Sequence, residues 1–299
     1  MHVNVLSIKG LEKSYGKIKA LKGVSFDIPQ GSVFGLLGPN GSGKTTLLSI
    51  ILDVLQADAG QFSWFDQPGS PAIRKQIGSL LETPNFYHYL SGTGNLKVTQ
   101  SINGRGTKTD IDEVLKQVKL YERRKSRFST YSLGMKQRLA IAAALLGKPK
   151  VLVLDEPTNG LDPVGIAEMR QLILDLRDQG YTIIMASHLL DEVERICSHV
   201  AILKTGELMA CGEVSEVLTD EDIIELSAPD MLTLREAILH FPGITAIKQQ
   251  QGSLLIHMEK GKGDTVKLNE YCFHNGLILS HLVSKKQRLE DKFFELTGA

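Results

Sequence analysis

An eight-residue stretch, Gly38 to Thr45, has a composition suited to binding a phosphate group. Its glycines tolerate backbone angles that direct several N–H groups at one anion. An apolar run over residues 33–37 predicts a buried strand before the stretch, and residues 46–52 predict a helix after it. The positive end of that helix would face the same anion. The order strand, glycine loop, helix therefore predicts a P-loop rather than a chance glycine-rich turn.

In such a loop, Lys44 reaches the β- and γ-phosphates of a nucleotide, and the Thr45 hydroxyl is placed to bind Mg²⁺. We expect the following residues to contact the nucleotide: Gly38, Pro39, Asn40, Gly41, Ser42, Gly43, Lys44, Thr45 and Thr46.

Two acidic residues, Asp155 and Glu156, follow a second apolar run over residues 151–154. Four apolar residues and then two acids are typical of a buried parallel strand that ends at a site. Asp155 can hold Mg²⁺ directly or through water, and Glu156 suits the general base that activates a water molecule. The alternative is a pair of solvated acids, which the P-loop upstream disfavours. A P-loop alone fits kinases, GTPases and motors, so later motifs must decide among them.

The composition excludes several classes of protein. Lys+Arg and Asp+Glu balance at 34 each over 299 residues, which gives no reason to expect nucleic acid as a partner. Three scattered cysteines indicate neither a disulfide framework nor a metal cluster, and they fit a reducing cytoplasm. The first residues lack a signal-peptide pattern. The longest apolar run, over residues 139–147, is shorter than a membrane-spanning helix needs. We expect a protein that is soluble alone and that relies on another chain for any step inside the bilayer.

The residues around the P-loop predict a mixed α/β domain. Strands are expected over residues 6–11, 24–28, 61–65 and 77–81, with a turn over residues 13–16. Residues 95–146 are mainly helical in pattern, and Asp110 looks like a helix start. We expect a helical subdomain over about residues 84–147. Beyond it, Asp162 and Pro163 predict the start of a helix that Gly180 ends. The remaining elements expected are strands over residues 182–186, 200–203 and 208–210 and a helix over residues 190–197.

A polar, acidic boundary over residues 212–222 separates a C-terminal part. Its pattern predicts strands over residues 223–227, 244–248, 253–258 and 277–283, with helices over residues 231–241 and 265–275. The order β-α-β-β-α-β suggests a small ferredoxin-like module. We therefore expect two domains, a nucleotide-binding domain over residues 1–213 and a C-terminal α+β accessory domain over residues 222–299.

A third motif runs from Tyr131 to Arg138 and reads Tyr-Ser-Leu-Gly-Met-Lys-Gln-Arg. It resembles the signature of the ATP-binding cassette (ABC) ATPases, and it lies before the acidic pair as it does in that family. The resemblance to this family continues at residues 155–158, 160–162 and 187–188. In total it spans about residues 6–212. The chain is most similar to the ATPase subunits of bacitracin-type and lantibiotic-immunity exporters. Residues 77–84 and 288–296 look like the corresponding segments of those proteins.

The resemblance implies further site residues. Tyr15 would stack on the adenine ring, although packing in the interior is an ordinary role for one tyrosine. His188 would contact the γ-phosphate and orient the attacking water, and Glu82 would join Thr45 and Asp155 at Mg²⁺. Asp162 would link the two nucleotide sites of a dimer. The signature residues that would contact the ATP of a second subunit are Ser132, Leu133, Gly134 and Met135.

The chain departs from the family pattern at three of these positions. Leu133 and Met135 replace a glycine and a glutamine that are commoner in the signature. Glu82 stands where most members have glutamine, which puts its role at the metal in doubt. A carboxylate can also ligate Mg²⁺, but it brings a negative charge close to the triphosphate.

The resemblance implies an ATPase that uses ATP and Mg²⁺ and drives a separate integral membrane permease of an exporter. Two copies, or one copy and a near relative, would close around two ATP molecules. The protein would lie in the cytoplasm, on the inner face of the membrane, bound to its permease. Phe86, Tyr87 and Tyr89 would contact the permease, or would pack inside the helical insert. The alternative is a soluble ABC ATPase unconnected with transport, which usually has two fused cassettes or a long coiled-coil insert.

Overall fold

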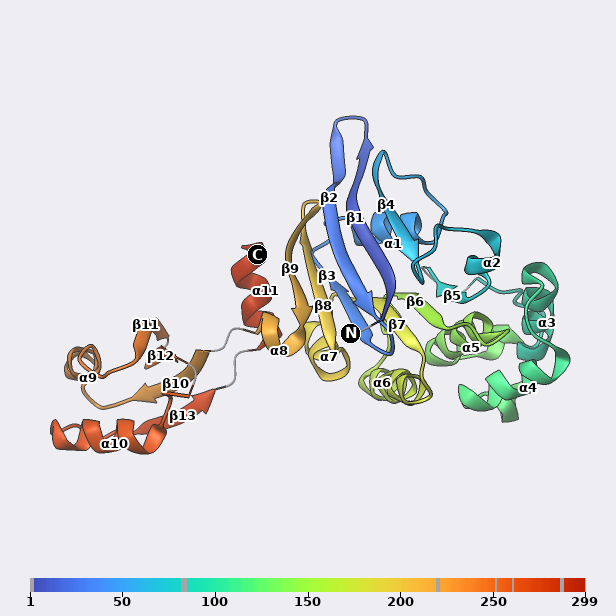
Figure 1. Ribbon diagram of the computed structural model, residues 1–299. Helices are drawn as coiled ribbons and strands as arrows, with labels where there is room; N and C mark the ends of the chain where they lie inside the picture. Colours follow the sequence, from blue (N-terminus) through green and yellow to red (C-terminus); the bar gives the residue numbers. More distant parts are fainter. Residues whose placement is uncertain are drawn as a thin grey trace. The chain divides into compact units, whose positions relative to one another are not determined.

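The computed structural model describes residues 3–81, 85–218, 221–250, 252–259, 261–285 and 288–298. The chain forms two compact units (Figure 1). The larger unit comprises residues 1–214 and 296–299, and the smaller comprises residues 215–295. Within the described ranges, no helix combines the length and the apolar character that crossing a membrane requires.

A six-stranded sheet forms the centre of the larger unit. Its strands are β3 (Val33–Leu37), β5 (Ile77–Leu80), β6 (Val151–Asp155), β7 (Thr182–Ala186), β8 (His199–Lys204) and β9 (Glu207–Glu213). They lie in the order β5-β6-β7-β3-β8-β9, and all neighbours are parallel except β8 and β9. Every residue of β3, β6 and β7 is buried, as expected for strands covered on both faces. This confirms the α/β fold predicted from the apolar runs.

A second sheet, antiparallel, contains β1 (Asn4–Tyr15), β2 (Ile18–Pro29) and β4 (Ala59–Trp64) in the order β2-β1-β4. These strands are longer than the sequence predicted. The turn expected over residues 13–16 is wrong, because β1 continues to Tyr15, which pairs with Ile18.

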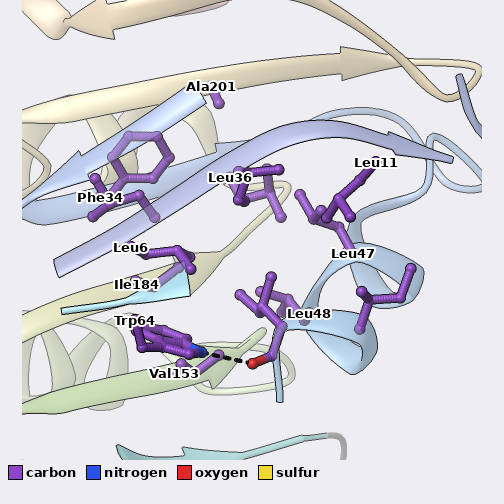
Figure 2. Close-up of a cluster of buried hydrophobic side chains, with 14 of the residues drawn as sticks. Leu6, Leu11, Phe34, Leu36, Leu47, Leu48, Trp64, Val153, Ile184 and Ala201 are labelled. Carbon is purple, nitrogen blue, oxygen red and sulfur yellow. Dashed lines mark hydrogen bonds between the residues drawn. The ribbon is translucent and has the colours of Figure 1, made fainter. Parts of the chain in front are cut away.

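Helix α1 (Lys44–Ile51) packs its apolar side chains between the two sheets. Figure 2 shows Leu47 and Leu48 of α1 among Leu6 of β1 and Val153 of β6. The indole nitrogen of Trp64 donates a hydrogen bond of 2.8 Å to the carbonyl oxygen of Ile51, the last residue of α1. The helix that follows the P-loop is therefore held by the core along its apolar side and at its C-terminal end.

The other helices of this unit are α2 (Pro71–Arg74), α3 (Gly92–Asn103), α4 (Lys108–Gln117), α5 (Leu133–Leu145), α6 (Pro163–Asp178) and α7 (Leu190–Ile196). Helix α8 (Val214–Val217) spans the boundary between the two units. Helix α6 begins after Asp162 as predicted. The helix start predicted at Asp110 is wrong. Thr107 caps α4, and Asp110 completes a capping box by accepting a 2.7 Å hydrogen bond from the Thr107 N–H.

The smaller unit has the predicted β-α-β-β-α-β order. Its elements are β10 (Glu221–Ser227), α9 (Met231–Ile238), β11 (Ile244–Gln250), β12 (Ser253–Glu259), α10 (Thr265–His274) and β13 (His281–Lys285). The strand order β11-β12-β10-β13, with antiparallel neighbours throughout, confirms the ferredoxin-like fold. The last strand begins at His281 rather than at 277, and Leu277 packs in the core of this unit from the segment before the strand. A further helix, α11 (Leu289–Thr297), was not predicted.

Gly78 of β5 lies directly against α5. A Cβ atom at this position would lie 2.2 Å from the carbonyl oxygen of Ala144, closer than real Cβ contacts. The helix and the strand can pack this closely only because residue 78 has no side chain.

We predict that Gly78→Ala lowers the free energy of unfolding by about 1–3 kcal/mol, because the helix or the strand must shift to relieve the overlap. Gly69→Ala is the matched control, since no atom lies within 4 Å of the added Cβ. Urea unfolding followed by circular dichroism measures both variants. Equal stability of the two variants would contradict the proposed close packing.

Candidate nucleotide-binding site

Two positions of the P-loop can hold only glycine, because neighbouring carbonyl oxygens occupy the space of a side chain. A Cβ atom at Gly38 would lie 2.4 Å from the carbonyl oxygen of Leu203, and one at Gly43 would lie 2.5 Å from that of Ala20. Gly43 is also the N-cap residue of α1 and provides no side-chain cap. The N–H groups at the start of α1 therefore stay without a capping side chain, which suits the binding of an anion.

The side chain of Lys44, the first residue of α1, extends back toward the first residues of the P-loop. Its Nζ donates hydrogen bonds of 2.7 Å to the carbonyl oxygen of Gly38 and 3.2 Å to that of Pro39. The residue is only 8% exposed, and this burial lowers the pKa of Lys44, while the nearby charges of Glu156 and Asp155 act in the opposite direction. The carboxylates thus favour the charged ammonium that a phosphate needs.

Asp155 ends β6 and is buried beside the P-loop. Its Oδ2 accepts a hydrogen bond of 3.4 Å from the Thr45 hydroxyl. Hydroxyl and carboxylate oxygens are the ligands that Mg²⁺ prefers, so these two residues fit the ion that the family uses. The buried hydroxyl of Ser42 has no hydrogen-bond partner among the described residues, and it lines the same cavity. An unsatisfied buried hydroxyl in a glycine loop also fits a bound phosphate.

Glu156 and His188 meet at the ends of neighbouring strands. Oε2 of Glu156 lies 2.8 Å from Nδ1 of His188. Glu156 has a φ of 49°, a left-handed conformation that is uncommon for a residue with a side chain, and its N–H donates to the carbonyl oxygen of Ala186. Because β6 and β7 are parallel neighbours, the residues after them share one edge of the sheet.

A cavity of about 1170 Å³ is lined by most of the predicted nucleotide contacts, residues 40–46, and by Asp155 and Glu156. Gly38, Pro39 and His188 are not among its lining residues. Tyr15 lies at its wall, 49% exposed at the end of β1, as a residue free to stack on a ring would be. The sequence reasoning missed several lining residues, because only the fold brings them here. They are Lys17, Ile18, Lys19, Ala20 and Lys22 near the start of β2, Gln137 of α5, Asn159, Gly160 and Thr205.

The signature residues lie at the start of α5. Ser132 caps the helix by accepting a hydrogen bond of 3.3 Å from the Met135 N–H. Leu133 is 41% exposed, lines the cavity and packs close to Gly160, where a Cβ atom would lie 3.1 Å from the leucine side chain. A Cβ atom at Gly134 would lie 3.8 Å from the side chain of Leu161. Contact of these residues with the ATP of another subunit remains a prediction.

Two further predicted site residues are Asp162 and Glu82. Asp162 caps α6, because its Oδ1 accepts a hydrogen bond of 2.8 Å from the Gly165 N–H. Its predicted role between the two sites of a dimer stays a prediction. Glu82, the third predicted ligand of Mg²⁺, lies outside the described residues.

Several known proteins are similar to this chain over nearly all of its length. The family model described as ABC transporter matches residues 21–159. The uncharacterized ABC transporter ATP-binding protein YdbJ of Bacillus subtilis (strain 168) is 37% identical over 303 residues, which span 99% of this chain and 96% of that protein. The bacitracin transport ATP-binding protein BcrA of Bacillus licheniformis is 36% identical over 302 residues, which span 98% and 97% of the two chains.

A solved structure is also similar. CbiO1 of Clostridium perfringens, part of the ABC transporter complex cbiONQ, aligns with a TM-score of 0.66 and 28% identity over 80% of this chain and 96% of its own. The matched family model, the relatives that cover nearly all of the chain and the similar structure all indicate the same family. This chain belongs to the family of ABC transporter ATP-binding proteins.

Proposed function

We propose that this chain is the ATP-binding and ATP-hydrolysing subunit of an exporter and that it drives a separate membrane permease through ATP-dependent dimerisation. The observation that carries the proposal is one cavity lined by Lys44, Asp155 and Glu156, with Nδ1 of His188 2.8 Å from Oε2 of Glu156. The names of the bacitracin transport relatives support transport as the process. The protein would act at the inner face of the membrane, in contact with its permease.

In this mechanism the P-loop N–H groups and Lys44 hold the β- and γ-phosphates. Thr45 and Asp155 would hold Mg²⁺, which would supply positive charge beside the phosphate oxygens. Glu156 accepts the proton of the attacking water as general base. When Glu156 is ionised, Nδ1 of His188 must donate the hydrogen of their 2.8 Å contact. In a neutral ring the other nitrogen, Nε2, then accepts a hydrogen bond from the water, and only a protonated ring donates from Nε2 to the γ-phosphate.

Dimerisation follows from where the signature lies. A hydroxyl at an N-cap and the N–H groups of the first helical turn are suitable anion ligands. Ser132 is exposed at the start of α5, so a phosphate carried by a second copy can approach it from outside. Each copy would then complete the ATP site of the other.

The proposed permease contact uses a hollow of about 400 Å³ beside the helical subdomain. Leu81, Thr99 and Asn103 are among its lining residues, and Leu81 immediately precedes Glu82. The three aromatic residues predicted at the permease contact do not line this hollow, and they divide into two groups. Phe86 packs edge-on against the buried ring of Phe128, with ring centroids 5.3 Å apart, while Tyr87 and Tyr89 are 50% and 71% exposed. Only the two tyrosines are therefore proposed to contact the permease.

We predict that Glu156→Gln retains ATP affinity and loses about 10²–10⁴-fold in hydrolysis, because an amide has the shape of the carboxylate but cannot take the proton. Steady-state ATPase and nucleotide affinity are measured on one preparation. Lys44→Ala is the contrasting variant and should lose affinity itself. A Glu156→Gln enzyme that retains more than about half of the rate would exclude Glu156 as the base.

We predict that Mg-ATP converts the Glu156→Gln protein into a dimer and that adding Ser132→Asp prevents this, because the new charge repels the partner's phosphate. Ser132→Asn is the matched control, since Asp and Asn both cap helices well and differ in charge. Light scattering with and without Mg-ATP measures both proteins. If the Asp variant dimerises as well as the Asn variant, Ser132 does not face a phosphate.

We predict that Tyr87→Ala combined with Tyr89→Ala weakens co-purification with the proposed permease, and changes stability by less than about 0.5 kcal/mol. Phe86→Ala should instead destabilise the chain by about 3 kcal/mol, the lower end of the range for a core phenylalanine, because this partly buried ring packs on Phe128. Val164→Ala, at an apolar residue that is 67% exposed on α6, serves as the control. Normal co-purification of the double tyrosine variant would exclude this docking surface.

A further inference from the structure

A second cavity, of about 330 Å³, lies at the edge of the central sheet opposite the nucleotide site. Lys150 and Tyr181 line it, and they immediately precede β6 and β7. Asp155 and His188 lie at or beyond the other ends of these two parallel strands. The two cavities share no lining residue. The second cavity is therefore separate from the nucleotide site, and its volume falls within the range of ligand pockets, about 300–1,000 Å³.

The walls of the second cavity come from distant segments that hydrogen bonds tie together. The Phe65 N–H donates to the carbonyl oxygen of Val5 at 2.8 Å, and the Thr182 N–H donates to that of Lys150 at 3.1 Å. The Gly31 N–H donates to Oγ1 of Thr182 at 2.9 Å, which holds the turn before β3 against the start of β7. None of these bonds needs a ligand, so the cavity is formed before anything binds.

Part of the lining is apolar or aromatic. Val5 and Pro149 are buried, and the half-buried rings of Phe65 and Tyr181 complete this part. Pockets for small molecules commonly combine such apolar and aromatic walls with a few polar groups.

Phe65 occupies a backbone position that a bulky residue rarely takes. Its φ is 53°, and that of Asp66 is 58°. Trp64 and Gln67, on either side, exchange two hydrogen bonds of 2.9 Å, so Phe65 and Asp66 form a two-residue hairpin turn. Such turns favour asparagine and glycine. A phenylalanine costs backbone energy here, and strained residues are concentrated at binding sites.

Among the described residues that line the second cavity, Lys150 alone carries a charge. Its Nζ lies 5.2 Å from the centroid of the Phe65 ring, and it has no ion pair within the described ranges. The neighbouring Lys148 differs, because its Nζ pairs with Glu113 at 3.0 Å. The second cavity therefore presents a positive charge that no described carboxylate neutralises.

The C-terminal end of α6 also borders the second cavity, and free carbonyl groups there would repel an anion. The carbonyl oxygens of residues 175–177 accept hydrogen bonds from the N–H groups of residues 179–181. The backbone thus satisfies these carbonyl groups by itself, and the Lys150 ammonium remains available to a ligand.

We propose that the second cavity binds a small aromatic acid, a ring compound that carries one carboxylate or a similar anionic group. The anionic group pairs with the Lys150 ammonium, and the ring packs against Phe65 and Tyr181, because aromatic rings contact one another favourably. Oε1 of Gln179, a further lining residue, accepts a hydrogen bond from Nε2 of Gln117, so its own Nε2 remains to donate to the ligand. This site goes beyond the proposed ATPase function and shares no group with it.

The test uses naphthoate and naphthamide as probes, because they have the same ring system and differ in charge. Isothermal titration calorimetry measures their binding to the full-length chain. The wild type should bind naphthoate at least about ten-fold more tightly than naphthamide, since hydrogen bonds to charged groups are the stronger ones. Lys150→Gln should abolish this difference by weakening naphthoate alone. Lys97→Gln, at an exposed residue of α3, is the matched control and should bind both probes as the wild type does.

A second variant tests the aromatic part of the site. Phe65→Leu keeps an apolar side chain and removes the ring, so it should weaken both probes by about two- to ten-fold. Circular dichroism checks that this variant is folded, and Lys150→Gln, a change at an exposed side chain, keeps the test valid if it is not. Binding is measured again in the Glu156→Gln background with saturating Mg-ATP, which occupies the nucleotide cavity. Naphthoate should then bind with unchanged affinity.

Four results would overturn the proposal. The first is a wild type that binds naphthoate no more tightly than naphthamide, or binds neither. The second is an equal effect of Lys150→Gln and Lys97→Gln. The third is a folded Phe65→Leu variant with unchanged affinity for both probes. The fourth is loss of naphthoate binding when Mg-ATP is added, which would place the probe in the nucleotide cavity.

Discussion

The nucleotide site depends on backbone-to-backbone packing around the P-loop. The carbonyl oxygens of Leu203 and Ala20 occupy the space that side chains at Gly38 and Gly43 would need. The Gly206 N–H donates a 3.0 Å hydrogen bond to the carbonyl oxygen of Ser42, which ties the turn between β8 and β9 to the loop. The Lys22 N–H in turn donates to the carbonyl oxygen of Gly206. Strands β2 and β8 thus hold the loop rigid, and preorganised N–H groups bind an anion without a cost of reordering.

The order of the strands explains why the remaining groups converge. Strand β7 lies between β3, which leads into the P-loop, and β6, which ends in Asp155. Because these strands are parallel, their carboxyl ends share one edge of the sheet, and the residues that follow them gather there. Lys44, Asp155, Glu156 and His188 therefore meet although they are far apart in sequence.

The sequence predicted best those elements whose environment is simple. Strands β3 and β7 have the predicted bounds because both of their faces are buried and their residues form unbroken apolar runs. Strands β1 and β2 were predicted too short, because their ends are exposed and pairing alone extends them to Tyr15 and Ile18. The same reasoning found the P-loop and the acidic pair, whose chemistry depends on local spacing. It did not find Gln137 or Thr205, which reach the cavity only through tertiary folding.

The buried Trp64 gives the larger unit a tryptophan fluorescence signal that the smaller unit lacks. It is the single tryptophan of the sequence, and its indole bonds to the end of the helix that begins at Lys44. Its fluorescence emission should lie at short wavelength while the core is dry and move to longer wavelength when water enters. The ferredoxin-like unit contains no tryptophan and contributes only tyrosine emission. A fluorescence titration with denaturant therefore reports the melting of the nucleotide-binding unit alone, while circular dichroism sees both, and a gap between the two curves measures how independently the units unfold.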